Sequence, residues 1–284
     1  MGRPACVYLS RHHTSFTNQP TARCLDTLQS RNGLGKTDES MLDNPSRLLH
    51  EINRVHDLVV ELDPEEVWRC LGPAGNARES LHSDVLEATE FAATASQPRG
   101  ISRVLNVESA ARGKVHFEGG FIAEGKRLPH IFEGAEGAIF LIATAGPGVE
   151  TEVEAMMARG DHIEGVVLDA GGSAVAINAA EQMQAQLMWE VEQAGYKVGP
   201  TITPGTEPWD IEGQRTMFDV LIADEIDVTL LESRLMYPQK TQSKMIPFGR
   251  DLKLVNNPDE APCRTCRAQR CPMRMEEYVG ILGE

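Results

Sequence analysis

Three cysteines near the C-terminal end of the chain have the spacing of metal ligands. Cys263, Cys266 and Cys271 fall within nine residues, and a proline follows the last of them. Thiolates at this spacing can turn around one metal centre, so we predict an iron–sulfur cluster here, with structural zinc and unligated thiols as the alternatives. A cluster of four irons needs a fourth ligand, which an exogenous group or one of three other cysteines could supply: Cys6, Cys24 or Cys70.

The composition limits the classes of partner and compartment. The chain has 284 residues and a formal net charge of −15, which would repel nucleic acid on average, so we expect no nucleic-acid partner. It contains no run of about 18 apolar residues that would predict a membrane span, and its first residues lack the apolar core of a signal peptide. The chain has six cysteines and no export signal, which favours reduced thiols over disulfides. We expect a cytoplasmic protein.

Composition and hydrophobic spacing divide the chain into three parts. Residues 1–45 are polar without a clear period and are predicted to be a flexible leader. Residues 46–255 carry the periodic segments of one folded domain. Residues 256–284 form a tail that holds the cysteine cluster.

Several segments of the central part have the apolar spacing of helices. They are residues 46–72, 80–93, 149–160, 170–194 and 211–223. Within the first, Asp63 and Pro64 predict a second helix start, because Asp is a good N-cap and Pro suits the first helical position. The helix over 170–194 has the broadest apolar face, and Gly195 fits its C-terminal end.

Other segments have the character of strands. Residues 101–132 are predicted to form strands and turns, and residues 227–231 a further strand. Residues 137–143 are continuously apolar, which predicts a buried central strand. Residues 243–249 are predicted to be a last strand at a sheet edge, because Pro247 cannot donate a ladder hydrogen bond.

Four short stretches stand out by their order and spacing. They are residues 144–148, residues 168–174, residues 203–205 with Trp209, Gln214, Met217 and Phe218, and residues 231–233 with Met236, Pro238, Lys240 and Ser243. In this order they resemble the reactivation domain of cobalamin-dependent methionine synthase, and more closely its short stand-alone microbial relatives. The resemblance covers about residues 50–250 and is densest over residues 137–249.

The resemblance implies a fold and a function. The fold is α/β (α+β), a twisted, mainly antiparallel sheet with flanking helices. The function is to bind S-adenosylmethionine, to dock on a corrinoid-binding protein or corrinoid methyltransferase, and to support reductive methylation of the partner's cobalamin. The corrinoid supplies the difficult chemistry and the protein positions it. A cluster in the tail would relay the electron from an electron donor, and an active chain would be an enzyme associated with a methyltransferase.

The resemblance also points to cofactor-binding residues. The candidates are Glu181, Thr203, Pro204, Gly205, Glu232 and Ser233. A Pro-Gly loop lets the backbone approach a ligand closely. A carboxylate such as Glu181, on the long helix, could pair with the amino group or sulfonium of the ligand. The sequence contains no readable pairing of a nucleophile with a base, so no catalytic residue is predicted.

The loop departs from the family's pattern Arg-x-x-Pro-Gly-Tyr. Thr201 stands in place of the Arg that would hold the ligand carboxylate, and Thr206 in place of the Tyr. A threonine hydroxyl does not replace a bidentate Arg–carboxylate contact, although Arg215 or Arg234 could compensate. The alternative function is a non-catalytic binding or electron-transfer module that keeps the fold and has lost S-adenosylmethionine binding. A third hypothesis is a redox or zinc enzyme on an unrelated α/β fold.

Overall fold

The computed structural model describes residues 53–72 and 79–253, which belong to one unit of the chain, Leu49–Glu284. The central strand of this unit is β5 (Gly137–Thr144), in which every residue is buried. The sheet around it has seven strands in the order β4-β3-β2-β5-β9-β6, with β1 beside β2, and every pairing is antiparallel. The predicted buried central strand is therefore confirmed.

The remaining strands surround β5. They are β1 (Arg54–Asp57), β2 (Arg99–Ala111), β3 (Lys114–Phe117), β4 (Ile122–Glu124), β6 (Lys197–Val198) and β9 (Thr241–Gly249). A separate two-stranded hairpin consists of β7 (Thr229–Leu230) and β8 (Met236–Tyr237). It precedes β9 directly in the chain.

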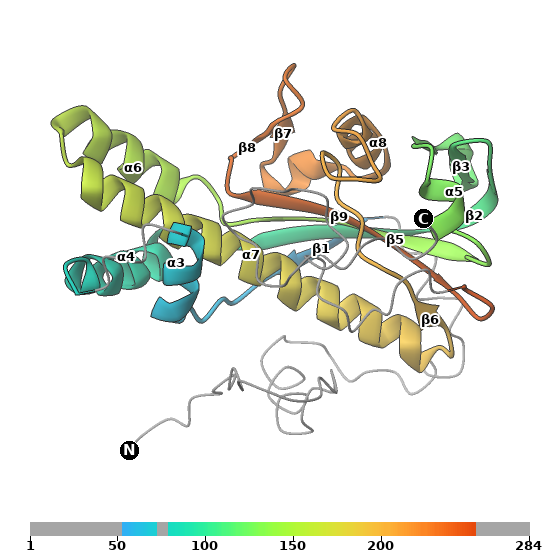
Figure 1. Cartoon of the computed structure of the whole chain (residues 1–284), viewed down its shortest axis with the longest axis horizontal. Coiled ribbons are helices and arrows are strands. Elements are labelled where there is room, and N and C mark those ends of the chain that lie inside the picture. Colours follow the sequence, from blue (N-terminus) through green and yellow to red (C-terminus); the bar gives the residue numbers. More distant parts are fainter. Residues whose placement is uncertain (1–52, 73–78, 254–284) are drawn as a thin grey trace. The chain divides into compact units, whose positions relative to one another are not determined.

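Helices cover both faces of the sheet (Figure 1). They are α3 (Pro64–Leu71), α4 (His82–Ala95), α5 (Leu128–Ile131), α6 (Gly148–Arg159), α7 (His162–Gln193) and α8 (Gly213–Val220), with short 3-10 turns at Glu118–Gly120 and Ala223–Ile226. The long helix α7 runs along one face, whereas α5, α8 and the β7–β8 hairpin lie on the other (Figure 1). Helices α3, α4 and α6 pack against the N-terminal part of α7.

The alternation of side chains along β5 creates these two faces. Phe140 and Ile142 face a core that includes Trp209 and Met217, on the α8 side. Leu141 and its alternate neighbours face α7. Residues on opposite faces of a strand belong to different layers, so the sheet separates a site on the α7 side from one on the α8 side.

The helix predictions are confirmed where the structure describes the chain, with two corrections, and residues 46–52 of the first predicted helix lie outside the described residues. Asp63 is the N-cap of α3 and accepts a hydrogen bond from the backbone of Glu65, as expected. Residues 54–57, however, form β1 and not a helix, because pairing with β2 decides the conformation of a segment whose apolar spacing is ambiguous. Helix α7 also begins at His162, so Gly171 and Gly172 lie inside it and do not open it.

The prediction that residues 243–249 form an edge strand is wrong for the second half of β9. There β6 and the segment after it pair with the strand, as in the hydrogen bond of 2.8 Å from the Gly199 N–H to the Pro247 carbonyl. The N and C=O of one residue point the same way in a strand, so the missing Pro247 N–H faces this short neighbour and not β5. Pro247 is tolerated because its missing N–H removes no hydrogen bond between β9 and β5.

Helix α7 is long and apolar enough, by length and composition alone, to cross a membrane. However, 61% of the residues in its most apolar window are buried inside the structure. Its apolar residues contact the sheet and the helices α3, α4 and α6. The composition of α7 is therefore explained by its place in the core.

Candidate functional site

The first half of β9 forms an open edge of the sheet. Within residues 53–72 and 79–253, pairing on the outer side of β9 begins at Met245, which exchanges hydrogen bonds of 2.9 and 2.8 Å with Ile202. Residues two apart in a strand direct their backbone groups to the same side. The N–H and C=O of Ser243 therefore point away from β5, and they are covered, because Ser243 is only 1% exposed.

Lys244 and Glu181 bring opposite charges to this edge on the α7 side. The Lys244 ammonium donates a hydrogen bond of 2.9 Å to the Oε1 of Gln184, on α7. Burial lowers the pKa of Lys244, and the negative charge of Glu181 partly offsets this effect. Glu181 itself is exposed. Sequence reasoning identified Glu181 but missed Lys244, because a single lysine in a strand has no distinguishing pattern.

The predicted Pro-Gly loop leaves the sheet at the same edge. Ile202 lies opposite Met245, so the antiparallel register places Thr203 across from Lys244. The Thr203 carbonyl accepts hydrogen bonds from the Thr206 backbone N–H and hydroxyl, at 3.2 and 2.8 Å. Pro204 is buried and Gly205 has a φ of +89°, so the loop is a closed turn that needs its glycine.

The other predicted residues lie elsewhere. Glu232 and Ser233 are exposed at the tip of the β7–β8 hairpin, on the α8 side of the sheet, and are not brought together with Glu181. Arg234 and Arg215 both pair with the Oε2 of Glu212, at 3.0 and 3.1 Å. Neither arginine lies on the face that carries Glu181, so neither can take the place of the absent loop arginine beside it.

Three of the four recognised stretches meet in a second polar cluster, around Lys240. Its ammonium contacts the Oδ1 of Asp169 at 2.7 Å and the Oγ of Ser173 at 2.9 Å, both on α7. Its backbone N–H donates to Glu150 at 2.7 Å, and its carbonyl accepts from the Ala145 N–H at 2.8 Å. These contacts hold α6, α7 and the start of β9 together, so the order and spacing of these stretches have a structural explanation.

Cys70 lies near this cluster. Burial raises the pKa of the Cys70 thiol, while the positive charges of Arg69 and Lys240 oppose that shift. No group of three or more His, Cys, Asp or Glu side chains that could hold a metal occurs in residues 53–72 and 79–253. The predicted ligands Cys263, Cys266 and Cys271 lie outside the described residues, so the metal cluster stays a prediction.

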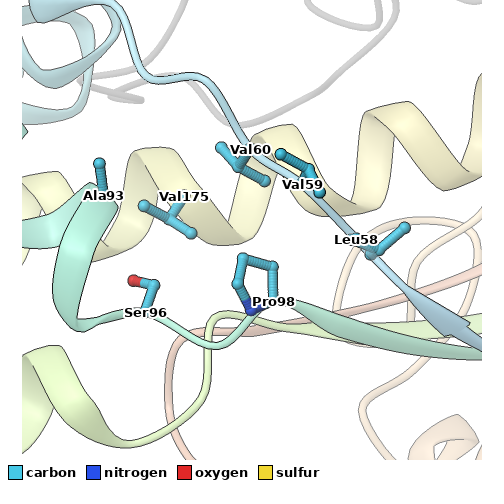
Figure 2. A pocket seen from close by; sticks show the side chains of 7 residues that line it. All are labelled: Leu58, Val59, Val60, Ala93, Ser96, Pro98 and Val175. Carbon is cyan, nitrogen blue, oxygen red and sulfur yellow. The ribbon is translucent and has the colours of Figure 1, made fainter. Parts of the chain in front are cut away.

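A small apolar pocket lies on the α7 side, where the segment after β1 passes α4 (Figure 2). Its volume is 150 Å³, and it is lined by Leu58, Val59, Val60, Ala93, Ser96, Pro98 and Val175. The Ser96 hydroxyl is buried, and the described part of the chain offers it no hydrogen-bond partner. None of the predicted site residues lines this pocket, and its lining carries no charge, so it does not suit a zwitterionic ligand.

Comparison with known proteins identifies the fold. Neither a scan against protein-family models nor a search of curated proteins returned a match. Among solved structures, the chain is similar to the MetH reactivation domain bound to AdoHcy, with a TM-score of 0.52 and 14% sequence identity. The match covers 72% of this chain and 81% of that chain. The likeness confirms the expected fold class, which is that of a reactivation domain.

Proposed function

We propose that this chain binds S-adenosylmethionine or a close analogue at the open edge of β9 and supports reductive methylation of a corrinoid on a partner protein. The partner would be a corrinoid-binding protein or a corrinoid methyltransferase in the cytoplasm. The similar solved domain has the same fold and binds AdoHcy, the demethylated form of the same ligand. Within the described residues, no strand pairs with the first half of β9 on its outer side, and a lysine and a glutamate, Lys244 and Glu181, lie on the α7 side of the sheet.

The observation that carries the proposal is the arrangement of Lys244, Glu181 and Thr203 at one edge. Ionic groups of opposite sign fit the carboxylate and amino group of the ligand. The ligand would supply the methyl group, and the residues of this chain would bind and orient it next to the partner.

Two binding measurements test this function. Isothermal titration calorimetry of the full chain with S-adenosylmethionine should show saturable binding. Pull-down with a cobalamin-loaded corrinoid protein should recover the chain, and a corrinoid-free preparation of the same protein is the matched control. Absence of both interactions would contradict the proposal.

A second candidate function is a binding or electron-transfer module that keeps the fold without the ligand. The absence of the loop arginine and tyrosine, at Thr201 and Thr206, favours it. This candidate predicts binding to the corrinoid partner but no heat of binding with S-adenosylmethionine. Micromolar binding of S-adenosylmethionine would exclude it.

We also propose that Cys263, Cys266 and Cys271 hold an iron–sulfur cluster that relays an electron to the corrinoid. Protein prepared without oxygen should contain iron and acid-labile sulfide and show a visible charge-transfer band. A Cys266→Ser variant should lose all three signals, whereas Cys70→Ser should keep them unless Cys70 is the fourth ligand. Zinc without sulfide would support the structural alternative, and the absence of any metal would contradict both.

A further inference from the structure

The β7–β8 hairpin carries an exposed apolar face on the α8 side of the sheet (Figure 1). Tyr237 lies opposite Thr229, and the Leu231 N–H donates a hydrogen bond of 2.9 Å to the Leu235 carbonyl. Residues that lie opposite one another, or two apart along a strand, share a face, so Leu231, Leu235 and Tyr237 point the same way. They are 44%, 58% and 49% exposed, so the described part of the chain leaves this face open to solvent.

Contacts behind the apolar face hold the hairpin in place. Met236, on the opposite side of β8, packs against the core that contains Met217 of α8. The Arg234 Nε donates a hydrogen bond of 3.0 Å to Glu212, and its Nη1 donates one of 2.6 Å to the Glu232 carbonyl. A fixed hairpin therefore presents the apolar face, which lowers the conformational entropy lost when another segment binds to it.

The layer that carries the hairpin is strongly acidic. Residues 203–238 contain eight Asp or Glu residues, all of them exposed, and only two arginines, which both pair with Glu212. Three of these acidic residues come directly before β7 or at the hairpin tip, and we call them the acidic rim: Asp224, Glu225 and Glu232. A second copy of the chain would bring the same negative rim against this one, which disfavours self-association through this face. The face instead fits a partner that carries apolar side chains among positive charges.

Residues 261–275 of the same chain have this chemistry. This basic segment contains no Asp or Glu and has four arginines: Arg264, Arg267, Arg270 and Arg274. Arginine pairs with carboxylates through a planar fork of donors. Met273 and Met275 add flexible apolar side chains, which adapt to irregular apolar surfaces.

The chain is long enough to bring the basic segment back to the hairpin. Strand β9 separates the hairpin from the last described residues, and its 9 residues span about 30 Å at the usual rise of a strand. The stretch from Lys253 to Cys263 reaches about 33 Å when extended, and the basic segment continues beyond it. A chain that leaves the sheet after β9 can therefore return along it to the hairpin.

We propose that the basic segment, residues 261–275, docks on the apolar face of the β7–β8 hairpin, with its arginines on the acidic rim and its methionines against Leu235 and Tyr237. The inference goes beyond the proposed function, because it requires neither a ligand nor a corrinoid partner. Docking places the three cysteines of the segment on the α8 side of the sheet, whether or not they hold a metal.

Photo-crosslinking in the full chain tests this docking. A p-benzoylphenylalanine label replaces Leu235, and digestion at lysine after irradiation releases residues 254–284 as one peptide, because they contain no lysine. The matched control carries the label in place of Ile163 on α7, which at 62% is about as exposed as Leu235. A further variant keeps the label at position 235 and all the cysteines, and combines four substitutions: Arg264→Gln, Arg267→Gln, Arg270→Gln and Arg274→Gln. Thermal unfolding checks that each variant is folded.

We expect the label at position 235 to capture the peptide 254–284 of its own chain. The four substitutions should lower the yield of this product by roughly 10-fold, the combined effect of several surface ion pairs, and 1 M salt should lower it similarly, because the Debye length falls to about 3 Å. Equal capture from positions 235 and 163, or capture that the four substitutions leave unchanged, would overturn the proposal. A cross-link found only between two chains, or no capture of the peptide at all, would overturn it too.

Discussion

The burial of His56 predicts how much the free energy of unfolding changes with pH. Its ring lies on β1, is 8% exposed and forms a 2.8 Å hydrogen bond with the hydroxyl of Ser102 on β2. Burial, together with the positive charge of Arg54, lowers the pKa of His56 from 6.5 to about 4. The folded protein therefore holds a neutral imidazole at pH values where the unfolded chain is already protonated.

Proton linkage determines whether acid stabilises or destabilises the folded state. Between pH 6.5 and pH 4 the unfolded state binds the proton and the folded state does not, so stability falls as the pH falls through this window. With these pKa values, acidification from pH 7.5 to pH 5 should cost about 2 kcal/mol through His56 alone. Because the chain contains other titrating groups, the contribution of His56 is measured as the difference in pH-dependent unfolding free energy between the wild-type chain and a His56 variant.

The assay is urea unfolding at both pH values, followed by tryptophan fluorescence, on the wild-type chain and on His56→Gln. Glutamine stays neutral throughout and can still bond to Ser102. The wild-type free energy of unfolding should fall by about 2 kcal/mol more than that of the variant between pH 7.5 and pH 5. Equal losses in the two proteins would refute the claim that the neutral imidazole is held buried in the folded state.

Three further predictions concern the helical end of the domain. Gly148→Ala should destabilise the fold by about 2–3 kcal/mol in urea unfolding, because its Cβ would overlap the Ala95 carbonyl oxygen, whereas Gly120→Ala, which meets nothing within 4 Å, should cost only about 1 kcal/mol for its positive φ. Lys240→Met should cost about 1–2 kcal/mol in the same assay, since it breaks a partly exposed ion pair and the contacts that fasten β9 to α7. Cys70 should react with iodoacetamide at pH 8 more slowly than the cysteine of a short reference peptide, as followed by mass spectrometry, because burial raises the pKa of its thiol; a rate equal to the peptide's would contradict its burial.

Much of the fold could be predicted from local patterns. The continuous apolar run of β5 and the N-cap at Asp63 each depend on a few neighbouring residues, so the sequence shows them directly. The strand β1 could not be predicted in this way, because its conformation depends on pairing with β2, about 45 residues later in the sequence. The same limit applies to Gly171 and Gly172, whose place inside α7 depends on close packing against α4 and Val149.

In the candidate site, too, some residues could be identified from local sequence patterns and others could not. Thr203 could be identified from motif order, and Glu181 as a carboxylate on the long helix. The position of Thr203 opposite Lys244 depends on the register of Ile202 with Met245, which the sequence does not show. Lys244 becomes a candidate only because the fold places it opposite Thr203 and next to Gln184 on α7. Sequence reasoning therefore considered Arg215 and Arg234 and missed Lys244. The hairpin residues Glu232 and Ser233 share a motif with β9 in the sequence but lie on the α8 side of the sheet.

The most direct test of the account is a crystal structure of the full chain soaked with AdoHcy. The account predicts electron density for the ligand along the open edge of β9, with its carboxylate at the Lys244 ammonium and its amino group at Glu181. Density at another place, such as the hairpin tip at Glu232, would contradict the proposed site. An edge that stays empty in crystals soaked at saturating AdoHcy, with no heat of binding in solution, would contradict the proposed function.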